Sequence, residues 1–186
     1  SDAERVLREI ERLLEELKEL VERVVRKSEE LLRRAKRVNE EVNREIKKLA
    51  DELEEVIRRK GGESEEVERT LREVTKEIRR LVRESEKLAE DIVRTSDKLV
   101  EDLREMLERV VREARKLVED VERRGVPKEV VDTLRRVVEE ITRELEELLE
   151  RLRRVSEEIR RTLEELLERT RRLVEEIERK LREALK

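Results

Sequence analysis

The sequence lacks Cys, His, Phe, Tyr and Trp, and its 186 residues include only three Gly and one Pro. Without Cys, His and Tyr, the chain has no thiol nucleophile, no imidazole ligand for a metal and few of the usual general bases. Phosphate-binding loops, zinc-ligand spacings and dinucleotide fingerprints are missing as well. We therefore expect no enzymatic activity, no cofactor and no metal site.

Long apolar runs and blocks of like charge are also missing. No stretch approaches the roughly 20 apolar residues of a membrane span, and the acidic start SDAERV is unlike a signal peptide. The 49 basic and 53 acidic residues are interspersed and give a net charge of −4, which argues against nucleic acid as a partner. We expect a soluble chain with no targeting signal, so its localisation is unknown. We expect neither a membrane nor nucleic acid among its partners.

The residues that are present are 55% charged and 35% hydrophobic, a composition typical of long helices and coiled coils. Only two short segments interrupt the helical pattern, at residues 60–64 and 124–127. Gly follows the helix end in each, Ser64 is suited to cap the next helix, and Pro127 suits a first helical position. The sequence therefore predicts an all-α fold with helices over about residues 3–60, 64–124 and 127–185.

Long helices of nearly equal length that are joined by short loops lie antiparallel to their neighbours. The sequence thus predicts an up-down-up, antiparallel three-helix bundle. No shift in composition marks a boundary, so we expect residues 1–186 to form a single rod-shaped domain. Both turns are short and permissive, and the sequence leaves the handedness of the bundle open.

The apolar residues recur every 18 residues rather than every seven. Leu81, Leu99 and Leu117 form one such set, whereas the seven-residue register that starts at Val6 fails at Lys27. Eighteen residues make five turns of a straight helix, while a seven-residue repeat imposes a left-handed supercoil. We therefore predict nearly straight helices, and we expect Leu99 to be buried near the middle of the second helix.

Several polar residues fall in the registers of core positions, and counting outward from the two turns places them at two heights. We predict a layer of three serines, Ser28, Ser96 and Ser156, and a second layer of Asn39, Asn43, Ser85 and Thr170. Thr70 and Thr75 are lesser candidates for buried polar residues. Four other threonines at the edges of the stripe are expected to be half exposed: Thr95, Thr133, Thr142 and Thr162.

The two asparagines make the stronger case for a hydrogen-bond network. A buried Ser or Thr hydroxyl can bond to a carbonyl one turn earlier in its own helix, whereas a carboxamide has two donors and an acceptor to satisfy. Sliding one helix by 18 residues would nearly restore the apolar pattern, so a polar layer distinguishes registers that apolar packing does not. We interpret Asn39 and Asn43 as register-setting residues in preference to a binding site.

The repeat of Leu81, Leu99 and Leu117, the Gly125-Val126-Pro127 turn and the Ser28, Ser96 and Ser156 layer resemble features of de novo designed helical bundles. The nearest counterparts are untwisted three-helix bundles with built-in hydrogen-bond networks, and the resemblance covers the whole chain. Natural spectrin-like three-helix repeats are similar in architecture but carry aromatic residues and histidines. The resemblance implies a hyperstable coiled-coil type of protein, expressed in a host cytoplasm, with no evolved function.

Two functions of different classes follow. The first is a designed structural scaffold, a monomer that requires no partner. The alternative is a three-helix component of a designed hetero- or homo-oligomer that binds a partner helix, with the polar layers setting specificity. A helical protein that opens on a lipid surface is disfavoured by the missing Trp and Phe and by the negative net charge.

Overall fold

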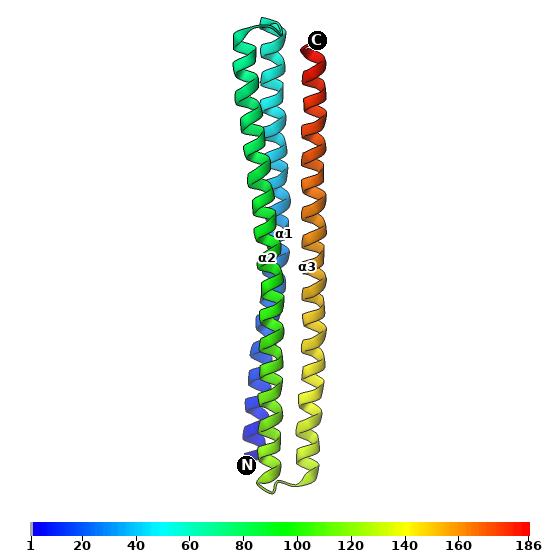
Figure 1. Ribbon diagram of the computed structural model, residues 1–186. Coiled ribbons are helices and arrows are strands. Elements are labelled where there is room, and N and C mark those ends of the chain that lie inside the picture. Colours follow the sequence, from blue (N-terminus) through cyan, green and yellow to red (C-terminus); the bar gives the residue numbers. More distant parts are fainter. Residues whose placement is uncertain (1) are drawn as a thin grey trace. The chain divides into compact units, whose positions relative to one another are not determined.

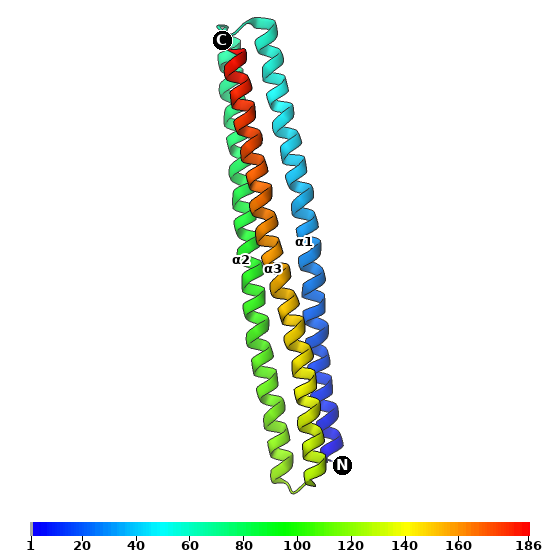
Figure 2. The ribbon, with the colours of Figure 1, turned by 90° about the vertical axis from the view of Figure 1, so that its right-hand side faces the viewer.

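A computed structural model describes residues 2–186 and contains three long helices (Figures 1 and 2). Helix α1 spans Asp2–Lys60, α2 spans Glu65–Arg123 and α3 spans Lys128–Ala184. The predicted all-α, up-down-up three-helix bundle is confirmed, and the helix ends differ from the predicted ones by at most one residue. In both views the colours run in opposite directions along successive helices, as expected for antiparallel neighbours. The straightness of the helices and the single rod-shaped domain stay predictions.

The first turn combines a left-handed glycine with a serine cap. Gly61 has a φ of 82°, a conformation that glycine adopts at little cost because it has no side chain. Its N–H donates to the Ile57 carbonyl at 2.9 Å. The Ser64 Oγ accepts a hydrogen bond from the Glu66 N–H at 3.2 Å. This bond satisfies one of the free N–H groups in the first turn of α2.

The second turn follows the same logic with proline in place of the serine cap. Gly125 has a φ of 84°, and Val126 is half buried against the adjoining apolar core. The Pro127 carbonyl accepts hydrogen bonds from the N–H groups of Val130 and Val131, at 3.0 and 3.2 Å. Pro127 therefore starts the hydrogen-bonding of α3, although the helix itself begins one residue later than predicted.

The chain divides into two compact units, each built from one segment of every helix. Unit 1 contains the described residues up to Glu30 together with Thr95–Glu157, and unit 2 contains Leu31–Arg94 with Glu158–Lys186. Each unit has a core of aliphatic side chains. The core of unit 1 includes Ile10, Leu14, Ala114, Leu134 and Leu152, and that of unit 2 includes Ile46, Leu53, Val67, Ile78 and Ile177.

The buried stripe is narrower than the sequence pattern suggests, and Leu99 is not part of it. Its side chain is 38% exposed, and Val38, Leu88 and Met106 are exposed too. Along α1, buried residues such as Ile10, Leu14 and Leu17 follow one another at alternating steps of three and four, which leaves the flanking apolar positions at the edge. The prediction that Leu99 is buried is therefore wrong. Leu99 belongs to an apolar 18-residue set, but this residue lies at the edge of the buried stripe.

Candidate functional site

A hydroxyl pair lies in the core of unit 1, where α2 and α3 meet. Ser96 donates from Oγ to the Oγ of Ser156 at 2.9 Å, and Ser156 donates to the Asp97 carboxylate at 3.3 Å. Both serines are buried, while Asp97 lies at the surface. Ser28 is also buried in unit 1, but neither of these two hydrogen bonds involves it. The two bonds form a short chain of hydrogen bonds that ends at the exposed carboxylate of Asp97.

Asp97 is a member of this group that the sequence analysis did not predict. The 18-residue register separates inward from outward positions, and Asp97 falls on the outward side, next to Ser96. A carboxylate beside a core serine at the edge of the stripe is the signal that identifies such a residue, because its oxygens can accept a hydrogen bond at the boundary with water.

A closed ring of three hydrogen bonds lies in unit 2, between α1 and α3. Asn43 donates from Nδ2 to Asn39 Oδ1 at 3.1 Å, and Asn39 donates from Nδ2 to Thr170 Oγ1 at 3.1 Å. Thr170 then donates from Oγ1 to Asn43 Oδ1 at 2.8 Å. Each residue donates once and accepts once around this ring. The polar groups of the buried Asn39 and the half-buried Asn43 are thereby paired with each other and with one hydroxyl.

The Leu166 carbonyl gives this ring a preferred direction. It lies 3.4 Å from Asn39 Nδ2 and 3.1 Å from Thr170 Oγ1. Turning both amides over would also close a ring of three bonds, but it would place Asn39 Oδ1 against the Leu166 oxygen, where two acceptors repel. The sequence does not indicate Leu166 as a partner, because every residue type has the same backbone carbonyl. The four-residue step from Leu166 to Thr170 is the usual back-bonding distance of a helical threonine.

Ser85 lies near the ring without joining it by a bond. It is half buried on α2, and with Asn39 it lines a small cavity of about 30 Å³ whose other walls are aliphatic. This volume exceeds the ~10–15 Å³ that one water molecule needs by this kind of measure. The Ser85 hydroxyl and the Asn39 amide supply polar partners for such a molecule.

We expect one ordered water in this cavity, bonded to the Ser85 hydroxyl and the Asn39 amide, because both groups are polar and the space fits one molecule. A crystal structure at high resolution checks this. In the Ser85→Val variant the water is expected to be lost while the ring of Asn39, Asn43 and Thr170 stays in place. A dry cavity in the unmodified chain contradicts the expectation.

The burial of the remaining threonines agrees with their positions in the apolar stripe, except at Thr142. Thr142 is buried and donates to the Val138 carbonyl at 2.6 Å, so the expectation that it is half exposed is wrong. This back-bond satisfies the hydroxyl, which lets it occupy a core position without an external partner. The other threonines are half buried at Thr70, Thr75 and Thr162 and exposed at Thr95 and Thr133.

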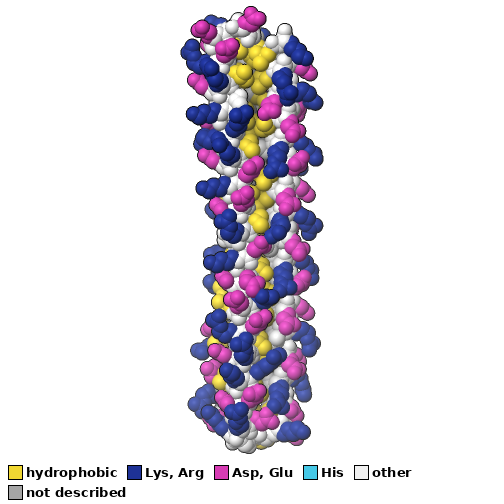
Figure 3. Space-filling view, in the orientation of Figure 1, with side chains coloured by type: hydrophobic (Ala, Val, Ile, Leu, Met, Phe, Trp, Pro, Cys, Tyr) yellow, Lys and Arg dark blue, Asp and Glu magenta, His cyan; other side chains and the backbone are white. Residues whose placement is uncertain are grey.

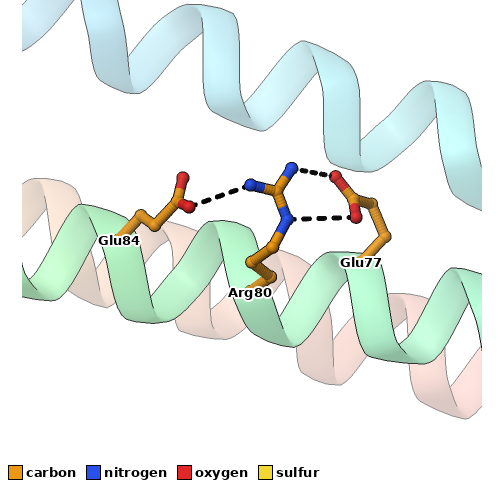
Figure 4. A network of polar contacts seen from close by, with 3 residues as sticks. All are labelled: Glu77, Arg80 and Glu84. Carbon is orange, nitrogen blue, oxygen red and sulfur yellow. Dashed lines mark hydrogen bonds and ion pairs between the residues drawn. The ribbon is translucent and has the colours of Figure 1, made fainter.

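A cluster of charged side chains on α2 perturbs two titratable groups. Arg80 donates to both carboxylate oxygens of Glu77, and from Nη1 to Glu84 at 2.9 Å (Figure 4). The hydrogen bonds to Arg80 lower the pKa of Glu77 against the opposing effect of partial burial, and the charge of Arg80 lowers it further. The same bonds raise the pKa of Arg80.

We expect the carboxyl of Glu77 to titrate below its ordinary pKa of 4.5. Because the folded value is depressed, any stabilisation from this pair is present above the ordinary pKa and is lost as the pH falls through the lower folded value. Titration followed by carbon NMR of the Glu carboxyl groups checks this. Arg80→Gln is expected to return the Glu77 pKa towards 4.5, and an unchanged titration curve in this variant contradicts the assignment.

Among residues 2–186, no group of three or more metal-ligating side chains is arranged to hold an ion. No helix in this part of the chain has the length and apolarity needed to cross a membrane.

Comparison with known proteins places the fold among designed bundles. The chain matches a solved structure described as a computationally designed three helix bundle, with a TM-score of 0.71 over 98% of this chain and 91% of that one. The sequences are 20% identical, so the likeness shows the fold alone. No family model matches the sequence, and neither does any curated protein. The chain therefore has the architecture of a computationally designed three-helix bundle with buried hydrogen bonds.

Proposed function

We propose that this chain is a designed structural scaffold whose role is to maintain its own fold. The observation that carries the proposal is the match to a computationally designed three-helix bundle along nearly the whole chain. The 18-residue repeat and the cores whose hydrophobic residues are all aliphatic support it, because both favour regular packing. On this proposal the chain has no evolved catalytic activity and needs neither cofactor nor metal.

The buried polar groups support the same proposal, because they are used within the fold. Asn39, Asn43 and Thr170 bond to one another, and Ser96 bonds to Ser156. Amides and hydroxyls that are already paired are poor candidates for binding a ligand, since a ligand would first have to break those bonds.

We propose that the two polar groups set the register of the helices. A shift of α3 by one 18-residue repeat would replace Thr170 with Leu152, and Asn39 would then face an aliphatic side chain. The amide would lose its partner at a cost of about 1–3 kcal/mol. The short turns limit how far a helix can shift along its axis. The polar groups therefore also act against axial shifts smaller than a full repeat.

The register proposal is tested with spin labels on exposed positions of α1 and α3 in unit 2, for example Lys47 and Glu164. The distance distribution between the labels is expected to be narrow, and to broaden when Asn39, Asn43 and Thr170 are all replaced by aliphatic residues. An equally narrow distribution in this variant contradicts a role in register.

The scaffold proposal is tested on the purified chain by light scattering and circular dichroism. The expected result is a helical monomer of 22.6 kDa that unfolds in one cooperative transition. A chain that remains unfolded, or that reaches full helicity only when another protein is added, contradicts the proposal.

A second function, a three-helix component that accepts a partner helix, is favoured by one observation. Unit 2 has an open apolar groove between α2 and α3, whereas a self-sufficient bundle gains by covering such surface. A chain that is a stable monomer can still bind a helix in this groove, so the second function adds to the first.

A further inference from the structure

The groove in unit 2 exposes apolar side chains that a partner could cover. It has a volume of about 620 Å³ and runs between α2 and α3. In the upper half of Figure 3, yellow apolar side chains show between the two helices, with dark blue side chains flanking them on the α2 side. The apolar side chains that line the groove are Leu71, Val74, Ile78, Val82, Val174, Ile177 and Leu181.

The apolar face of this groove has the same sequence pattern as the corresponding face of unit 1, where a smaller cavity of about 200 Å³ lies beside Val118 and Val138. Residues two repeats apart occupy equivalent positions on one helix face, yet in three such pairs the member in unit 1 is buried and the member in unit 2 is only partly buried. The pairs are Val118 and Val82, Val138 and Val174, and Leu145 and Leu181. These three positions are thus more open in unit 2, whereas Val74 and Ile177 are buried there and their counterparts Val110 and Ile141 are half buried in unit 1.

The rim of the groove on α2 is positively charged. Arg72, Lys76, Arg79 and Arg83 line the groove at successive steps of four, three and four residues, which places them along one edge of the helix. None of the four forms an ion pair with another residue in the described part of the chain. The chain as a whole carries a net charge of −4, so this rim is a local departure from its average.

Three carboxylates close to these cations in sequence are engaged elsewhere, whereas Glu73, next to Arg72, forms no ion pair among the described residues. Glu77 and Glu84 are both held by Arg80 (Figure 4), and Glu86, which also lines the groove, forms an ion pair with Arg171 at 3.6 Å. On α3 the groove is lined by one further carboxylate, that of Glu178. The α2 rim therefore presents four cations that form no ion pair with any residue of the described range 2–186.

We propose that this groove binds a single amphipathic α-helix with an aliphatic stripe and acidic residues along the edge that faces α2. The stripe covers the apolar floor, and the acidic edge pairs with the four cations. The floor and rim on α2 extend from Leu71 to Glu86, about 16 residues or 24 Å of helix, which sets the length of the bound segment at about four turns. The inference rests on the second proposed function and specifies its ligand.

A second copy of the folded chain fits the groove poorly. Each helix of a folded copy turns its apolar stripe inward and its charged face outward, and that outer face carries both signs of charge. An extended lipid surface is also a poor fit, because the apolar floor is recessed between two helices. Both remain as measurable outcomes that would overturn the proposal.

The test uses the full chain and two dye-labelled synthetic peptides of about three heptads, with Leu and Ile at the core positions. One peptide has Glu at the flanking positions, and the matched peptide has Lys there. Fluorescence anisotropy is expected to show that the acidic peptide binds about tenfold or more tightly than the basic one. Equal affinities for the two peptides, or no binding of the acidic peptide, overturn the proposal.

Charge reversal locates the site. The variant with Arg72, Lys76, Arg79 and Arg83 all changed to Glu is expected to reverse the preference, so that the basic peptide binds more tightly. A matched control makes the same change in charge on α2 within unit 1 and is expected to keep the preference for the acidic peptide: Lys98→Glu, Arg109→Glu, Arg112→Glu and Lys116→Glu. If both variants behave alike, binding does not occur at this groove and the proposal is overturned.

Light scattering and vesicle binding complete the experiment. A concentration-dependent dimer that is abolished by charge reversal at the groove, or binding to phosphatidylserine vesicles in place of the acidic peptide, overturns the choice of a partner helix. A chain that is monomeric and helical but binds no acidic peptide leaves the scaffold function intact and removes this inference. A chain that is unfolded when alone contradicts the scaffold function instead.

Discussion

Replacing Leu53 with alanine is expected to destabilise the chain by about 2–5 kcal/mol. The Leu53 side chain is fully buried in the core of unit 2, and its removal leaves a cavity that the packed aliphatic neighbours fill only in part. Chemical denaturation of both proteins, with the free energy extrapolated to water, measures the difference.

Leu99→Ala provides the matched control, because it makes the same chemical change at a residue that is 38% exposed. A partly exposed leucine has less contact to lose and leaves no closed cavity, so a loss of well under 2 kcal/mol is expected. Equal losses at the two positions would contradict the burial pattern.

The second large effect is expected from Thr170→Val, with a loss of about 1–3 kcal/mol. Valine keeps the shape of threonine but removes the hydroxyl that accepts from Asn39 and donates to Asn43. Asn39 lies in the core, so apart from the single water expected beside Ser85 its amide has no water available to replace the lost hydroxyl. Denaturation followed by circular dichroism measures the loss.

Replacing all three members of the ring tests whether pairing explains this cost. The variant Asn39→Leu, Asn43→Leu, Thr170→Val leaves no amide without a partner, so it is expected to be more stable than Thr170→Val alone. It is also expected to retain full helicity. A triple variant that is less stable than the single one would mean that the ring contributes more than the mutual satisfaction of its groups.

The sequence predicts the helices and turns well, because local chemistry determines them. Gly61 and Gly125 follow the helix ends with positive φ, and Ser64 caps α2. Charged residues and aliphatic residues at a regular spacing leave few alternatives for the segments between these breaks. The helix ends can therefore be placed to within a residue.

The position of the stripe edge could not be predicted in the same way. The repeat gives the direction in which Leu99 points but not how far the neighbouring helices extend over it, which depends on their separation and on the side chains between them. The open groove escapes prediction for the same reason. Val82 and Val118 occupy equivalent positions in the repeat but differ in burial, so the repeat alone does not determine which positions are covered.

For the polar residues, the sequence indicates which lie at one height but not which atoms bond. Counting from the turns puts Ser96 near Ser156 and Asn39 near Thr170. The choice of Asp97 and of the Leu166 carbonyl as further partners depends on side-chain rotamers and on a backbone group. These are properties of three-dimensional placement, which a one-dimensional repeat does not encode.

The two polar groups also make α3 different from the other helices. The ring links α3 to α1 in unit 2, and the serine pair links α3 to α2 in unit 1. A break in the chain at Gly125 would separate α3 from a hairpin of α1 and α2. Because each of those helices has its polar partner on α3, the freed helix would carry the information needed to find its place on the hairpin. We therefore expect α3 and the hairpin of α1 and α2 to reassemble when they are made as two fragments.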